Sequence, residues 1–233
     1  MNSNKKILQK VRELKTYSNL DLTELESMLE ENIREEAVKS SKRKKSELSI
    51  IKSLFKDNFY KGRENLKDKT FMDKDFYVYI TEHRVFYTKN DLGYEVVEGK
   101  LFNFNFDFLD EYISGRMDLQ CESVDVEIDL VELQTFIDTT DKRDLKPYTI
   151  KITKGNKVYI LGINPRYLMD TIKFTNNNVI KVYLRTNRQT NIINVPIYNA
   201  EVDENGLLQK LAVTLPVYIV YNEKMKFNQS VLV

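Results

Sequence analysis

The chain has 233 residues, of which 42% are apolar and 30% charged. Its net charge is only +1, which excludes overall charge as a basis for binding polyanions. This length accommodates one large or two small globular domains. A single cysteine, no apolar run approaching the ~20 residues of a membrane span, and a first segment without a secretion signal together predict a cytoplasmic protein without disulfides.

Residues 1–70 are predicted to form a helical, charged N-terminal region. Its basic run KSSKRKK has two interpretations: contact with phosphates, or a solvated surface that balances the acidic helix before it. The run contributes four candidate DNA-binding residues, namely Lys42, Arg43, Lys44 and Lys45. The segment after it carries an apolar stripe that includes Ile51, Leu54 and Phe55, so it is expected to pack on the folded body.

Residues 71–222 are predicted to form an α+β body, because strand patterns begin near Asp75. A hairpin is expected from Tyr77–Ile80 and Val85–Thr88, with His83 in its turn. Alternating phenylalanines then predict a half-buried strand, and a helical turn is expected to end at Gly115. The strand's phenylalanines are Phe102, Phe104 and Phe106.

Two amphipathic helices are predicted in this body. Asp129 is expected to cap the first, which runs to Thr140. Its buried residues are predicted to be Leu130, Leu133, Phe136 and Ile137.

A hairpin turning at Gly155 leads to the second helix, Pro165–Phe174, which Asn164 is expected to cap. Alternating strands follow, with Ile180, Val182 and Leu184 on one face and Lys181, Tyr183 and Arg185 on the other. The predicted architecture is an antiparallel sheet with amphipathic helices on one side, followed by a tail at 223–233.

The sequence offers little for catalysis. The lone His83 has no evident nucleophile or carboxylate partner, and Cys121 lies in a polar connector. Asp125, Glu127 and Asp129 would share one strand face and are able to hold Mg²⁺, but a solvated strand face is the more common meaning of such a pattern. We therefore expect no enzyme, no catalytic residue, no metal and no cofactor.

Positive charge at the two helices favours a role in binding DNA rather than in catalysis. Lys142, Arg143, Arg166 and Lys173 are candidates for contact with a DNA backbone without base reading. The alternative is an ordinary mixed surface, because acidic residues share these faces.

The stretch INPRYLMDTIKF, followed by NNNVIKVYLRT, NIINVPIY and LAVTLPVYI, resembles the third domain of the bacterial DNA polymerase III β subunit, the sliding clamp. VDVEIDLVELQTFID resembles the first helix of that domain, and YVYITEHRVFYTK resembles the strand pair that closes the second domain. The resemblance spans about residues 75–221. A full clamp chain has three such domains, and residues 1–70 have no counterpart in the family. The resemblance therefore implies a reduced clamp-like fold, of a phage or mobile-element type.

The resemblance also implies partners and a docking site. In the family, polymerases and repair proteins insert a short apolar and acidic peptide beside the matching helix and final strand. The corresponding residues here are Asn164, Tyr167, Val213, Leu215, Pro216 and Val217. For Val213 and Val217, filling of the core is an equal alternative.

The implied function is that of a non-enzymatic processivity factor, a homo-oligomer that holds double-stranded DNA and tethers a DNA polymerase or another clamp-motif protein. The alternative is a clamp-fold adaptor, decoy or regulator that does not encircle DNA.

Overall fold

The computed structural model describes residues 7, 11, 47–97, 107–140, 146–186, 190–219 and 224–233. The chain divides into a unit of residues 1–48 and a unit of residues 49–233. In the first unit, the described positions Ile7, Val11, Glu47 and Leu48 are helical. Several predicted features lie outside the described residues: the basic residues Lys42, Arg43, Lys44 and Lys45, the phenylalanine strand, and the pair Lys142 and Arg143.

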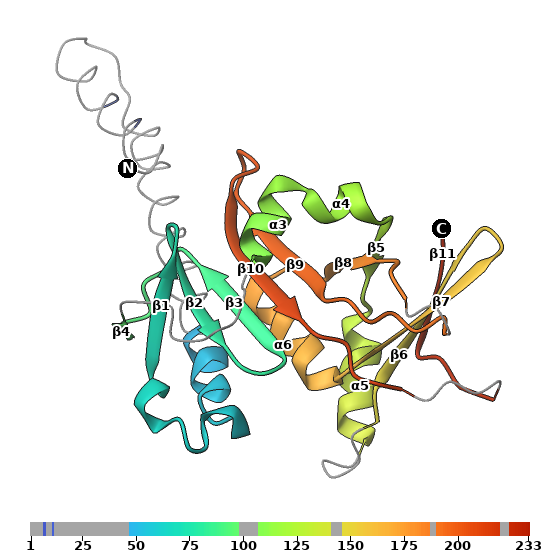
Figure 1. The fold of residues 1–233 in the computed structure, drawn as a ribbon, viewed down its shortest axis with the longest axis horizontal. Coiled ribbons are helices and arrows are strands. Elements are labelled where there is room, and N and C mark those ends of the chain that lie inside the picture. Colours follow the sequence, from blue (N-terminus) through green and yellow to red (C-terminus); the bar gives the residue numbers. More distant parts are fainter. Residues whose placement is uncertain are drawn as a thin grey trace. The chain divides into compact units, whose positions relative to one another are not determined.

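An eight-stranded sheet forms the main part of the second unit, in the order β4-β1-β2-β3-β10-β9-β8-β5 (Figure 1). All its described pairs are antiparallel except β1 with β4. The predicted hairpin is confirmed as β2 and β3, and β3 pairs with β10 far along the chain, with Val85 opposite Val213. The strands are β1 Lys69–Asp73, β2 Phe76–Ile80, β3 Arg84–Thr88, β4 Glu95–Val96, β5 Ser123–Glu127, β8 Val179–Tyr183, β9 Ile197–Val202 and β10 Leu208–Thr214.

A second sheet has the order β11-β6-β7. The predicted hairpin at Gly155 is confirmed as β6 (Tyr148–Lys154) and β7 (Lys157–Ile163). β11 (Gln229–Leu232) lies parallel to β6, so part of the predicted tail is an ordered strand. Gly162 in β7 permits close packing, because a Cβ atom there would lie 2.6 Å from Ile219 Cγ2.

The helices follow the local capping signals. Residues 49–54 are helical, and the chain then turns through η1 (Asn58–Tyr60) and η2 (Glu64–Leu66) before β1 begins at Lys69. Gly115, at φ 62°, separates α3 (Phe108–Ser114) from α4 (Arg116–Gln120). Asp129 caps α5 (Leu130–Thr139), and Asn164 caps α6 (Pro165–Thr175), as predicted.

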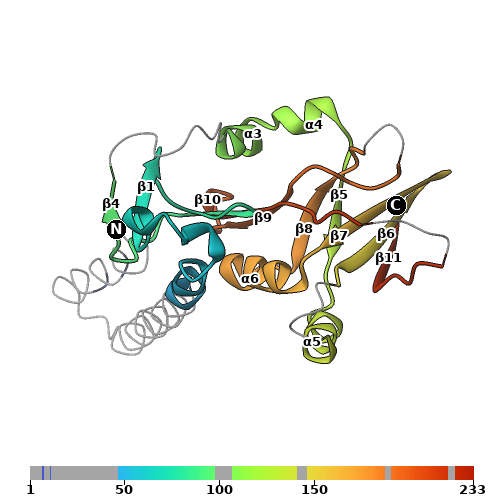
Figure 2. The same cartoon turned by 60° about the horizontal axis from the view of Figure 1, so that its bottom comes forward.

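The α+β class is confirmed, but the helices lie on both faces of the large sheet rather than on one (Figure 2). Tyr198 of β9 stacks against Tyr112 of α3. Its neighbour Asn199 accepts a 2.6 Å hydrogen bond from Thr175 of α6, on the opposite face. Because both faces of β9 are covered here, its polarity does not alternate, and the sequence alone did not reveal the second helical layer.

Two predicted orientations are also wrong. Leu130, in the first turn of α5, is 42% exposed rather than buried, whereas Leu133 is fully buried. Tyr183, assigned to a polar face, is 1% exposed because its ring packs edge-on against Tyr198 beneath α3. The covering layer of α3 therefore turns a predicted solvent face into core.

Candidate functional site

Helix α6 is the element around which the candidate site is built. The Asn164 side chain accepts hydrogen bonds from the backbone N–H groups of Arg166 and Tyr167, and Pro165 occupies the first turn. Most of the helix is buried, and its exposed side chains are those of Arg166 and Lys173. Seven residues of an α-helix span about 10 Å, so the two cations lie two turns apart on the outer side.

A buried arginine attaches the first half of α6 to the sheet. Arg84 of β3 is 5% exposed, and its Nη1 donates a 2.8 Å hydrogen bond to Asp170 Oδ2. Its Nη2 lies 3.4 Å from Asp57 Oδ2, and its guanidinium carbon lies 3.9 Å from the centre of the Tyr167 ring. A guanidinium suits this position because it can pair with two carboxylates and stack on an aromatic ring at once.

The electrostatics of this cluster show opposing effects. Burial raises the pKa of the Asp170 carboxyl, and Arg84 acts in the opposite direction. Burial also raises the pKa of the Tyr167 hydroxyl. Since Arg84 is paired with Asp170 and Asp57, the charges of Arg166 and Lys173 are left as the positive surface of the helix.

Lys210 of β10 attaches the other end of α6. Its Nζ donates a 3.1 Å hydrogen bond to the carbonyl of Phe174 in the last turn and lies 2.7 Å from a Glu201 carboxylate oxygen. The Lys210 side chain is 5% exposed. A cation at the C-terminal end of a helix also interacts favourably with the helix dipole. With Arg84 in its first half and Lys210 at its C-terminal end, α6 is held against the sheet at two positions.

The residues predicted for peptide binding are only partly brought together. Leu215, Pro216 and Val217 follow β10 and are half-buried. The Leu215 N–H donates to the carbonyl of His83, whose ring stacks on Tyr167 with the centroids 6.1 Å apart. Leu215 is therefore linked through its backbone to His83, and His83 is linked through its ring to Tyr167; we call these three residues the Leu215 surface.

Two other residues predicted for peptide binding, Val213 and Asn164, have structural roles outside the Leu215 surface. Val213 is 1% exposed and pairs with Tyr198, so it lies on the α3 face of the sheet, opposite Tyr167. The Asn164 amide oxygen is used in capping α6. The sequence predicts His83 as a turn residue without a place in a docking surface. Its position in the turn beside Arg84 is the one sequence signal for its place in this surface.

The DNA-binding candidates on α5 have little support from that helix itself. Its exposed face carries Leu130, Val131 and Asp138, and the helix contains no lysine or arginine. Lys142 and Arg143 follow it outside the described residues. Within the two helices, the positive charge of the described residues therefore comes from α6.

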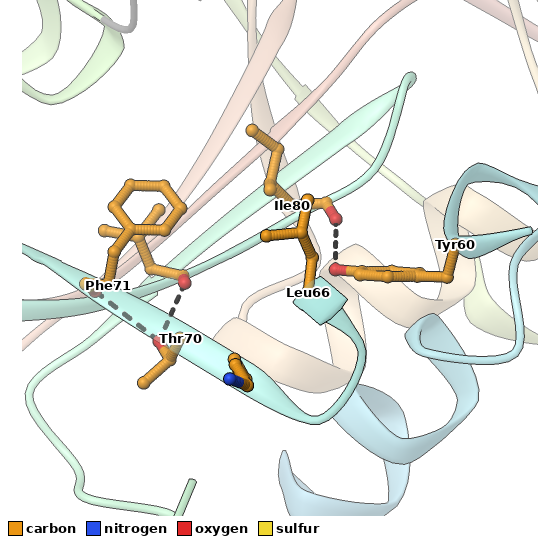
Figure 3. Close-up of a pocket in the computed structure, with 7 residues that line it drawn as sticks. Tyr60, Leu66, Thr70, Phe71 and Ile80 are labelled. Atoms are coloured by element: carbon orange, nitrogen blue, oxygen red, sulfur yellow. Dashed lines mark hydrogen bonds between the residues drawn. The ribbon is translucent and has the colours of Figure 1, made fainter. Parts of the chain in front are cut away.

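A small hollow lies between η2 and strands β1 and β2 (Figure 3). Its volume of about 10 Å³ has room for about one water molecule. The Tyr60 hydroxyl donates to the Ile80 carbonyl at 2.6 Å, and the Thr70 hydroxyl donates to the Val78 carbonyl at 2.8 Å. Because these polar groups are already paired and the volume is small, the hollow is not a candidate ligand site.

The described residues form neither a metal site nor a membrane-spanning helix. They contain no group of three or more histidine, cysteine or acidic residues placed to hold a metal ion, so Asp125, Glu127 and Asp129 do not form such a group. No helix among them combines the length and apolar character needed to cross a membrane.

The chain is similar to two solved structures of bacterial DNA polymerase III β subunits. One, assigned as a DNA polymerase III β subunit of Eubacterium rectale, is 20% identical with a TM-score of 0.34 over 62% of this chain and 41% of its own. The other, the DNA polymerase III β subunit of Pseudomonas aeruginosa, is 13% identical with a TM-score of 0.35 over 61% of this chain and 42% of its own. The match thus spans about two fifths of either solved chain.

No protein-family model matches the chain. No curated protein matches it either.

Proposed function

We propose that this chain is a clamp-like protein that holds the backbone of double-stranded DNA through α6 and tethers a replication protein through the Leu215 surface. The observation that carries the proposal is the presentation of Arg166 and Lys173 on a helix that buried cations anchor in its first half and at its C-terminal end. An anchored helix holds its charges in place before DNA arrives, so little ordering is needed on binding.

The proposed contact reads charge rather than sequence. Arg166 and Lys173 lie about 10 Å apart along the helix, a distance over which a DNA duplex carries several phosphates. The helix is buried in its own sheet over most of its surface, which leaves no broad face to enter a major groove. Contact with phosphates alone is what a protein moving along DNA requires.

The first prediction concerns these two cations. Replacing both residues, as Arg166→Gln and Lys173→Gln, is expected to weaken binding to a DNA duplex at every sequence tested. The slope of log K against log salt should fall by about 2, one unit for each lost phosphate contact. The measurement is a fluorescence-anisotropy titration at several salt concentrations.

A matched control removes the same charge elsewhere. Lys67 and Lys157 are exposed and lie outside α6, so Lys67→Gln with Lys157→Gln should leave the slope nearly unchanged. Equal slopes for the two double variants would contradict a contact centred on α6. Retention of the full chain on nicked circular DNA, with release on linearisation, separates encirclement from an adaptor that does not encircle DNA.

The second prediction concerns partner docking. A partially buried leucine beside a stacked histidine and tyrosine suits a short peptide anchored by an apolar side chain. Leu215→Asp is expected to weaken binding of an apolar and acidic clamp-motif peptide by about tenfold or more, since it places a charge where the peptide's apolar anchor would be desolvated. Isothermal titration calorimetry measures this loss.

Leu207 provides the control for this substitution. It is 59% exposed in the turn between β9 and β10, so Leu207→Asp adds the same charge at a position away from the Leu215 surface. If both variants bind the peptide as the unaltered chain does, Leu215 is not part of the docking surface.

A further inference from the structure

The edge of β6 is covered by a distant segment of the same chain. β11 lies parallel to β6 over four residue pairs, from Gln229 opposite Ile150 to Leu232 opposite Thr153 (Figure 1). The backbone N–H groups of Asn228 and Val233 extend this pairing to the Thr149 and Thr153 carbonyls. An extended peptide added to a sheet edge through main-chain hydrogen bonds is a recurrent form of protein recognition.

The side chains make this edge selective for the segment that occupies it. Asn228 Oδ1 accepts a 2.9 Å hydrogen bond from the backbone N–H of Thr149, a residue only 3% exposed. The Gln229 side-chain amide donates to the Glu127 carbonyl of β5. Phe227 packs on Ile160 and Ile219. These contacts match the sequence of residues 224–233, so the peptide that fits the edge best is that same segment.

The segment has no fully buried side chain and keeps apolar groups in solvent, although Phe227 and Val231 pack in part against neighbouring clusters. Its alternate residues Ser230 and Leu232 are exposed, with Leu232 at 84%, and Val233 is 53% exposed. A strand with one paired edge and little buried surface opens at a lower free-energy cost than the strands of the core. None of its contacts with β6 depends on which copy of the chain supplies the strand.

We propose that the edge of β6 is a strand-exchange site, at which residues 224–233 of one copy pair with β6 of a second copy. The partner is therefore a second copy of this chain, joined by the β11–β6 register observed within one copy. This inference goes beyond the proposed DNA binding and does not depend on it.

Cysteine pairs across the register test the exchange. Lys151 and Ser230 are opposite residues of the parallel pair. The spacing of neighbouring strands, about 4.8 Å, lies within the Cα separations found in disulfides. In a Cys121→Ser background, one chain carries Lys151→Cys and another carries Ser230→Cys. Oxidation of the mixture should give a covalent heterodimer whose yield rises as the chain concentration approaches about 1 mM, the usual effective concentration of a tethered segment.

Two controls make this result decisive. Ser230→Cys mixed with Lys157→Cys measures collisional cross-linking, because Lys157 is exposed and pairs with Lys154. Lys151→Cys and Ser230→Cys together in one chain should form a disulfide, either within that chain or between two copies. Absence of the heterodimer while the double variant cross-links within one chain would overturn the exchange. An equal yield in the Lys157→Cys mixture would also overturn it.

A peptide measurement tests the same site independently. A chain ending at residue 223 should bind a labelled peptide of residues 224–233, and an Asn228→Ala peptide should bind about tenfold more weakly, because the buried Thr149 N–H loses its partner. If the shortened chain is folded by circular dichroism and binds neither peptide, the edge is not an exchange site. If it does not fold, the cysteine experiment decides.

Discussion

An Arg84→Met variant is expected to lose about 3 kcal/mol of unfolding free energy, the low end of the range for breaking a buried ion pair. Methionine fills the space but leaves Asp170 and Asp57 without their cation, and their side chains are only 30% and 18% exposed. The low end of this free-energy range applies because the Asp170 side chain is partly accessible to water. Urea unfolding at neutral pH measures the loss.

The pH dependence of this loss has a defined sign. Burial already raises the pKa of Asp170, and removing Arg84 raises that pKa further. When the pKa of a carboxyl is higher in the folded state than in the unfolded state, its protonated form stabilises the folded state. This contribution to the unfolding free energy is lost as the pH rises through the folded-state pKa. The deficit of Arg84→Met should therefore be largest at neutral pH and shrink on acidification towards the ordinary aspartate pKa of about 3.9.

Adding Asp170→Asn tests the assigned cause of the Arg84→Met deficit. The double variant should recover part of the lost free energy, since the uncompensated carboxylate is gone. A deficit for Arg84→Met below about 1 kcal/mol, the usual size for exposed pairs, would show that the cluster behaves as a surface pair and does not anchor α6.

A Lys210→Met variant is expected to lose about 2–3 kcal/mol, because two partners lose a buried cation. The Phe174 carbonyl at the end of α6 loses its donor, and Glu201, whose side chain is 17% exposed, loses its counter-charge. Thermal and urea unfolding measure the loss. Hydrogen exchange should also show faster exchange in the last turn of α6, where the anchor is removed.

Glu201→Gln separates the two parts of this effect. In Lys210→Met with Glu201→Gln, the cost of the buried carboxylate is relieved, while the loss at the Phe174 carbonyl remains. Partial recovery is expected. Full recovery would mean that Lys210 serves only to neutralise Glu201 and does not hold the helix end.

Local chemistry determined much of the secondary structure. Asn164 with Pro165 begins α6, Asp129 begins α5, and Gly155 lies in the turn between β6 and β7, all as the sequence predicts. These signals are readable because each depends on hydrogen bonds or dihedral angles within a few residues. The exposure of Arg166 and Lys173 also followed from the helical period.

Only the tertiary structure decided how the site is assembled. Arg84 meets Asp57 and Asp170 across separations of 27 and 86 residues, and no local pattern links them. The face occupied by Val213 depends on which strands flank β10, and the partner of β11 is a strand about eighty residues earlier in the chain. Such pairings are set by long-range packing, so a sequence with clear local signals still left the anchors of α6 and the covered edge of β6 undetermined.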